Sequence, residues 1–113
     1  MVIKQVADKT SHKVYIIQST DRKLDLADVA SAKNLSMDEL LSEMESIVYQ
    51  GTKLNINYYI DEVLDEDQQE EIFDYLMEAE NDSMANLLDE FSDDYDEEEL
   101  RLMRIKFISE VAN

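Results

Sequence analysis

Two helix starts and two helix stops fall within residues 24–51, and they constrain the fold of this chain more than any other feature. Asp25 can cap the start of a first helix, and Asn34 can end it. Ser36, followed by Glu39, forms a capping-box pattern that starts a second helix after a break of about three residues. Two capped helices joined by so short a turn are typical of a helix-turn-helix motif.

The second helix carries the strongest pattern in the chain. Leu35, just before the cap, can reach Leu40 as a hydrophobic staple. Gly51, the only glycine, stands where a left-handed C-terminal cap would be needed. Apolar residues recur between these points at helical spacing: Met37, Leu40, Leu41, Met44, Ile47 and Val48. We therefore expect this helix to span roughly Met37 to Gln50.

A third helix is expected before the motif, because a helix-turn-helix pair cannot bury its own core. Ser11 can cap this helix, and Val14 and Ile17 would then face inward, with Tyr15 as a further candidate. The segment KVYIIQS is also rich in β-branched and aromatic residues, so a strand is the alternative. We favour the helix.

The segment after Gly51 has a different pattern. Leu54, Ile56 and Tyr58 alternate with polar residues, which predicts a brief extended or wing-like segment. Asn57 can then cap a short helix over YYIDEVL.

Helical patterns return from Asp65 onward. Ser83 can cap a following helix, and Asp96 with Glu99 forms a second capping box. The sequence therefore predicts an all-α fold of about six helices. Its parts would be a linker from a preceding domain at residues 1–10, a helix-turn-helix subdomain at 11–64, and an acidic helical extension at 65–113 packed on it.

Composition narrows the classes of function. The chain has 113 residues and no cysteine, so disulfides and thiolate metal sites are excluded. No apolar run approaches the roughly 20 residues that span a bilayer, and the N-terminal residues lack the apolar core of a secretory signal. A soluble, cytoplasmic protein is therefore expected.

Charge divides unevenly along the chain, whose formal net charge is −18. Residues 1–54 hold seven lysines and arginines against eight acidic residues, whereas residues 55–113 hold three against twenty. Because carboxylates repel phosphates, any DNA contact should come from the N-terminal part and should weaken with salt. The candidate DNA-contacting residues are Lys4, Lys9, Lys13, Arg22, Lys23, Lys33 and Lys53, with an ordinary solvated surface as the alternative for these scattered cations.

The second helix of the motif is an unusual candidate for DNA recognition. Its outward side chains are polar or acidic: Asp38, Glu39, Ser42, Glu43, Glu45 and Ser46. A helix that reads the major groove normally exposes basic and amide side chains at its start. The sequence therefore disfavours direct base recognition by this helix.

Residues for catalysis or ligand binding are missing. A phosphate-binding loop needs two glycines, and this chain has one. His12 is the only histidine, which excludes zinc motifs and triads that need a second histidine, and we expect it to be an ordinary surface residue. The acidic clusters at residues 65–67 and 93–96 lack the glycine of an EF-hand loop and are better explained as helix caps. No catalytic, cofactor-binding or metal-binding residue is assigned.

Three stretches carry a family resemblance: IIQSTDRKLDLADVA, IVYQGTKLNINYYI and RLMRIKFISE. Together with the acidic helices between them, they make essentially the whole chain resemble the extreme C-terminal region of RecQ-type ATP-dependent DNA helicases of the Bacteroides and Porphyromonas kind. The resemblance implies a parent enzyme with two RecA-like motor lobes, a zinc-binding and winged-helix region and an HRDC domain. ATP, magnesium and zinc would bind only in those parts, so no functional residue is carried over to this chain.

The leading hypothesis is a C-terminal accessory, non-catalytic domain of a 3′–5′ helicase of recombination and repair. Its partners would be the other domains of the helicase, a further protein and, weakly, DNA through the N-terminal half. The alternatives are a stand-alone helix-turn-helix regulator and an acidic protein-interaction module. A helical dimerisation module is a third class, if Leu102, Ile105 and Ile108 are exposed.

Overall fold

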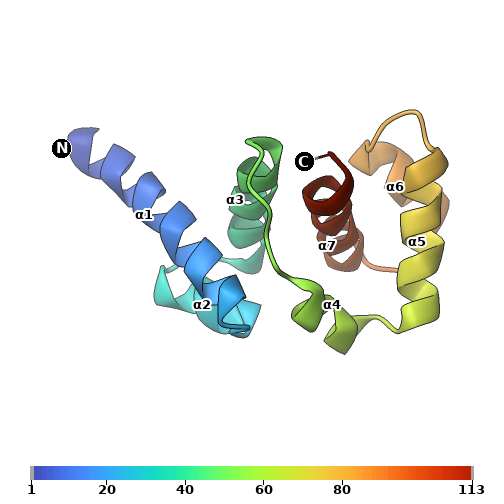
Figure 1. The fold of residues 1–113 in the computed structure, drawn as a ribbon, viewed down its shortest axis with the longest axis horizontal. Helices are drawn as coiled ribbons and strands as arrows, with labels where there is room; N and C mark the ends of the chain where they lie inside the picture. Colours follow the sequence, from blue (N-terminus) through green and yellow to red (C-terminus); the bar gives the residue numbers. More distant parts are fainter. Residues whose placement is uncertain (1, 113) are drawn as a thin grey trace.

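The computed structural model describes the backbone of residues 2–112 and the side chains of residues 12–111. Within that part the chain is built from helices joined by short loops, without a strand (Figure 1). The elements are α1 (Val2–Asp21), α2 (Leu26–Ala32), α3 (Met37–Tyr49), α4 (Asn57–Val63), α5 (Glu66–Glu78), α6 (Met84–Phe91), α7 (Glu97–Phe107) and a π-helical turn, η1 (Ile108–Ala112). The all-α fold is confirmed, with seven α-helices in the described residues in place of about six.

The helix-turn-helix pair, α2 and α3, forms where the capping signals predict it. The Asp25 side chain accepts a hydrogen bond from the Ala27 amide at 2.8 Å and starts α2. In the capping box of α3, Ser36 Oγ accepts from the Glu39 amide at 3.1 Å, and Glu39 Oε1 accepts from the Ser36 amide at 2.9 Å. Gln50 is the C-terminal cap of α3, so the expected bounds hold to within one residue.

One kind of stop ends the first three helices. The residue after each C-terminal cap is left-handed: Lys23 at φ 61°, Asn34 at φ 58° and Gly51 at φ 100°. The next amide bonds back across the turn, as the Leu24 amide does to the Ser19 carbonyl at 3.0 Å. The predicted stops at Asn34 and Gly51 are confirmed, and Lys23 ends α1 in the same way without the usual glycine or asparagine.

Helix α1 confirms the choice of helix over strand but corrects its inward face. It begins at Val2, so Ser11 lies within the helix and is not its cap. Ile17 packs against the core as predicted and Ile16 is buried, whereas Val14 is 48% exposed. The other inward residues include Thr20, whose hydroxyl donates to the Ile16 carbonyl at 3.0 Å. A polar residue satisfied by its own helix can face the core, and hydrophobic spacing does not reveal it.

The chain between α3 and α4 is extended but pairs with no strand in the described residues. Leu54 and Ile56 are buried there, as their alternation predicts. Ser109 of η1 replaces a partner strand: its Oγ accepts from the Leu54 amide at 2.9 Å and donates to the Leu54 carbonyl at 3.4 Å. The expected Asn57 cap is wrong, because Ile56 is the N-terminal cap of α4 and Asn57 is the first helical residue.

The acidic clusters of the second half cap helices. Asp65 forms a capping box with Gln68 at the start of α5, and Asp96 forms one with Glu99 at the start of α7. Ser83 caps α6 by accepting from the Asn86 amide at 3.3 Å. Carboxylates at these positions also favour the positive end of the helix dipole. The capping interpretation of both clusters is confirmed.

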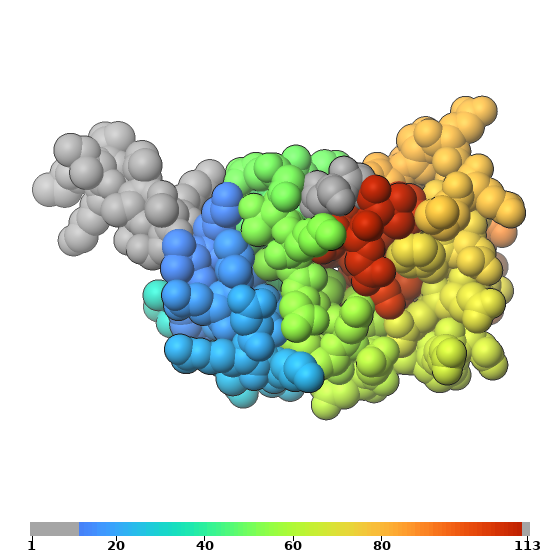
Figure 2. Space-filling view, in the orientation of Figure 1, coloured from blue at the N-terminus to red at the C-terminus, as the bar shows by residue number. Residues whose placement is uncertain are grey.

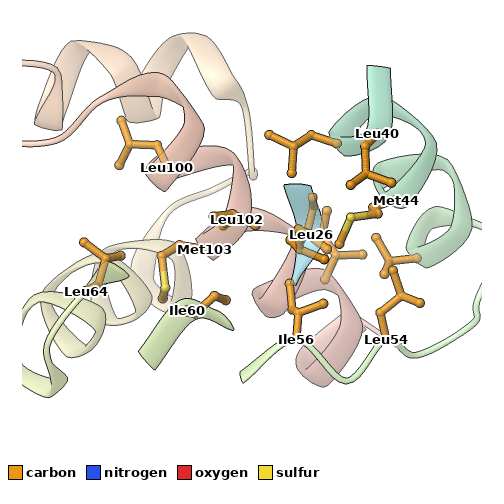
Figure 3. Close-up of a cluster of buried hydrophobic side chains, with 14 of the residues drawn as sticks. Leu26, Leu40, Met44, Leu54, Ile56, Ile60, Leu64, Leu100, Leu102 and Met103 are labelled. Carbon is orange, nitrogen blue, oxygen red and sulfur yellow. The ribbon is translucent and has the colours of Figure 1, made fainter. Parts of the chain in front are cut away.

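Helix α7 lies at the centre of the molecule and contacts α3, α4, α5 and α6 (Figure 1). Leu102, Ile105 and Ile108 are at most 2% exposed, so the premise of the dimerisation hypothesis is wrong. A helix with apolar residues on more than one face is buried within a protein, and α7 is such a helix. Its side chains join both halves of the chain in one hydrophobic cluster, which includes Leu26 of α2 and Leu102 of α7 (Figure 3).

Lys23 offers a test of the left-handed stops. A left-handed residue with a Cβ costs about 1–2 kcal/mol, partly offset for glycine by its larger unfolded-state entropy. We expect Lys23→Gly to raise the free energy of unfolding by about 0.5–1 kcal/mol in urea denaturation. Gly51→Ala should lower it by about 1 kcal/mol although no atom lies within 4 Å of the added Cβ. Equal effects of the two changes would contradict this explanation.

Tyr95 offers a test of packing at high pH. Its ring is 8% exposed, and its hydroxyl donates to Glu71 Oε1 at 2.7 Å. Burial, followed by the hydrogen bond to Glu71, raises the pKa of Tyr95 to about 12 from 10.0. A raised pKa means that this stabilisation is complete below pH 10 and is lost as pH rises through 12. We expect the free energy of unfolding of Tyr95→Phe to fall less than that of the unchanged chain over this range, and an equal fall would contradict the assignment.

Candidate functional site

The outward face of α3 is the candidate functional surface, because a helix-turn-helix protein that reads DNA uses its second helix to contact the bases. Asp38 is 78% exposed as a side chain, and it lies in the first turn of α3. Ser42 and Glu45 follow at helical spacing on the same side. These three residues contact α7 of the acidic half.

Arg101 of α7 holds that face of α3. Its Nη1 donates to Asp38 Oδ1 at 2.5 Å, and its Nη2 donates to Ser42 Oγ at 2.9 Å and Glu45 Oε1 at 3.1 Å. The arginine is only 8% exposed. A planar guanidinium with five donors suits three acceptors along a helix, whereas a lysine ammonium would not.

Arg104, one helical turn further along α7, extends the contact. Its Nη1 donates to Glu45 Oε2 at 2.9 Å, so the two arginines share one carboxylate. Its Nε donates to the Asp82 carbonyl, and its Nη2 donates to the Tyr49 hydroxyl. The guanidinium carbon also lies 5.3 Å from the centroid of the Tyr49 ring. We call Arg101, Arg104 and their partners on α3 the arginine clamp.

The clamp shifts the pKa values of Arg101 and Tyr49. Burial alone would lower the pKa of Arg101, but the hydrogen bonds that it donates to Glu45 and Asp38 outweigh burial and raise that pKa. Burial raises the pKa of Tyr49, with Asp82 and Glu45 adding to the rise and Arg104 opposing it. Arg101 therefore stays charged, and Tyr49 stays protonated, under ordinary conditions.

The opposite side of α3 packs on α1. His12 Nδ1 lies 3.2 Å from Glu43 Oε1, and Lys13 Nζ donates to Gln50 Oε1 at 3.0 Å. His12 is therefore a partly buried partner of α3 and not a solvated surface residue. Both flanks of α3 are engaged within the chain, which leaves this helix poorly placed to enter a groove of DNA.

The seven candidate DNA-contacting residues fall into different environments. The side chains of Lys4 and Lys9 lie outside the described residues. Lys13 is bound to α3, and Lys33 lies 4.8 Å from the centroid of the Tyr15 ring. Arg22, Lys23 and Lys53 are exposed. DNA contact by these residues stays a prediction.

The second half of the chain uses its cations internally. Its three cations are Arg101, Arg104 and Lys106, and the last donates to Gln69 Oε1 at 3.2 Å. Among the described side chains no group of three or more His, Cys, Asp or Glu residues could hold a metal ion. In the same part of the chain, no helix is long and apolar enough to cross a membrane.

Comparison with known families agrees with the helix-turn-helix formed by α2 and α3. A family model described as the RecQ-1-like helix-turn-helix domain matches residues 10–60. This part of the chain is similar to the RecQ-1-like helix-turn-helix domain. The match covers the second half of α1, all of α2 and α3, and the start of α4, and it ends before the acidic helices. No curated protein matches the chain. The RecQ resemblance is thus confirmed for the helix-turn-helix region, whereas the Bacteroides and Porphyromonas type stays a prediction.

Sequence reasoning missed the residues of the acidic half that bind the helix-turn-helix region. Arg101 and Arg104 look like ordinary basic residues of a last helix, where they could complement its dipole. One signal in the sequence could have found them. Residues 55–113 hold only three cations against twenty acidic residues, and Arg101 and Arg104 lie among apolar residues in the last helix. Cations on a buried helix need acceptors, and α3 supplies an unusual row of them.

Arg101 is the most direct test of the clamp. We expect Arg101→Leu to lower the free energy of unfolding by about 2–3 kcal/mol, because Glu45 and Asp38 lose a charged donor while Arg104 still serves Glu45. The stability of Arg101→Lys should lie between that of the unchanged chain and that of Arg101→Leu, since lysine keeps the positive charge but lacks the planar set of donors. Arg22→Leu, at an exposed cation, is the control and should change stability by less than about 0.5 kcal/mol. Equal values for Arg101→Leu and Arg22→Leu would contradict the clamp.

Proposed function

We propose that this chain is the C-terminal accessory, non-catalytic domain of a RecQ-type 3′–5′ DNA helicase acting in recombination and repair, of the Bacteroides and Porphyromonas kind. It modulates substrate or partner binding, while ATP, magnesium and zinc bind elsewhere in the parent chain. The RecQ-1-like match at residues 10–60 supports the family. The arginine clamp supports the mode of action, because it directs α3 to the chain's own acidic half.

A stand-alone regulator is the weaker candidate. Such a protein needs the start of its second helix free to meet base edges. In α3, Asp38, Ser42 and Glu45 at that face are bound to Arg101. Opening the clamp would expose carboxylates, which repel the phosphates on either side of the groove. We therefore place the function in protein contacts, with weak DNA contact through exposed cations such as Arg22 and Lys53 as a secondary part.

The test uses the natural reading frame that contains these residues. We expect it to include a P-loop motor, and we expect removal of residues 1–113 to alter unwinding of forked DNA or partner binding while DNA-stimulated ATP hydrolysis persists. The physical reason is that this chain holds one glycine and so cannot form a phosphate-binding loop. A frame without any motor, or loss of ATP hydrolysis on removal, would contradict the proposal.

The purified chain supplies a second arm of the same experiment. Selection from random duplex DNA should yield no consensus sequence, and binding to single-stranded or forked DNA should be weak and should fall with salt. A consensus that is lost on Ser42→Ala would favour the regulator. The absence of any shift at low salt would remove the DNA part of the proposal and leave the protein-contact part in place.

A further inference from the structure

A groove lies between α5 and the end of the chain, away from the arginine clamp. It has a volume of about 260 Å³ and is lined by Glu66, Gln69, Glu70, Phe73, Asp74, Lys106 and Glu110. The first five residues belong to α5, and the last two belong to α7 and η1. Residues of α5 and of the C-terminal helix meet on the face of the molecule drawn in Figure 2, where they are yellow and red.

The carboxylates of this groove are available. Glu66, Glu70, Asp74 and Glu110 are all exposed. Among the described side chains, none of the four forms an ion pair with a lysine, arginine or histidine. This contrasts with Glu45, which binds two arginines at the clamp. Four unpaired carboxylates around one hollow attract a cationic group more strongly than the same charges spread over a surface.

An aromatic ring gives the groove an apolar component. Phe73 lines it and packs edge-to-face on Phe107, with ring centroids 5.5 Å apart at 68°. The ring is partly buried, so its position is fixed by the core beneath it. A guanidinium stacks on such a ring while its N–H groups reach neighbouring carboxylates. The groove therefore suits arginine better than lysine.

Lys106 is the groove's own cation, and its hydrogen bond is to an amide. Its Nζ donates to Gln69 Oε1 at 3.2 Å. Gln69 is itself fixed, because its Nε2 donates to Asp61 Oδ1 at 2.9 Å and to the Leu64 carbonyl at 3.0 Å. Lys106 is thus held at one wall of the groove and leaves the carboxylates of α5 to another cation.

We propose that this groove binds an arginine-bearing basic segment of a partner protein. The partner is protein and not nucleic acid, because the same carboxylates repel phosphate. The arginine side chain lies over Phe73, and its guanidinium donates to Glu70 and Asp74, which are one helical turn apart on α5. This inference deepens the proposed function by naming the chemistry of the partner, and the groove can be tested without the motor.

The experiment is a fluorescence-anisotropy titration of the chain with a labelled helical peptide that carries two arginines one turn apart. We expect Glu70→Lys/Asp74→Lys to weaken binding by about tenfold or more, since both partner carboxylates are reversed. Asp89→Lys/Glu90→Lys on α6 is the matched control: both residues are exposed, and the change in net charge is the same. It should weaken binding less than about threefold.

Two further variants test the geometry. Lys106→Met should tighten binding because it removes a positive charge that repels the arginine, and Phe73→Leu should reduce the preference for the arginine peptide over its lysine counterpart. Circular dichroism melts check that both variants fold.

Equal weakening by the α5 and α6 charge reversals would show general charge attraction and would overturn the proposal, as would the absence of binding. Groove-dependent binding of spermidine with the affinity of the peptide would assign the groove to a free polyamine and would also overturn it. None of these outcomes bears on whether a motor is linked to the chain.

Discussion

The contact of Arg101 with α3 is the interaction on which the arrangement of the two halves depends. Without it, Asp38, Ser42 and Glu45 would form an acidic row on a helix-turn-helix unit, and α7 would bring a cation into the core with no acceptor. The acidic row and the buried cation are each unfavourable alone, but Arg101 donates hydrogen bonds to all three residues of the row. The hydrophobic contacts of α7 supply the burial, whereas the arginines fix which face of α3 it covers.

This arrangement explains why a helix-turn-helix can be so acidic. The charge of −17 in residues 55–113 includes all three of that half's cations, and two of these neutralise α3. The outer surface of the acidic half is therefore left with carboxylates. A domain of this charge suits cationic protein segments and is poorly suited to DNA. The groove at α5 is the place on that surface where charge and an aromatic ring coincide.

Local signals predicted much of the fold. The caps at Asp25, Ser36 and Asp96 are satisfied within a few residues, so their pattern is visible in the sequence. The inward face of α1 was not predictable in the same way, because Thr20 faces the core with its hydroxyl bonded to its own helix. The buried alternation of Leu54 and Ile56 after Gly51 was predictable, but the partner of this segment was not, because Ser109, which bonds the Leu54 backbone, lies 55 residues away.

The candidate site was less predictable than the fold for the same reason. Arg101 and Asp38 are 63 residues apart, and a capping or periodicity argument does not reach that far. Hydrogen exchange of backbone amides tests the central claim most directly. The account predicts that α3 and α7 open with the same free energy and that Arg101→Leu lowers both together. Opening of α7 at a much lower free energy than α3, with α3 unchanged by the substitution, would contradict it.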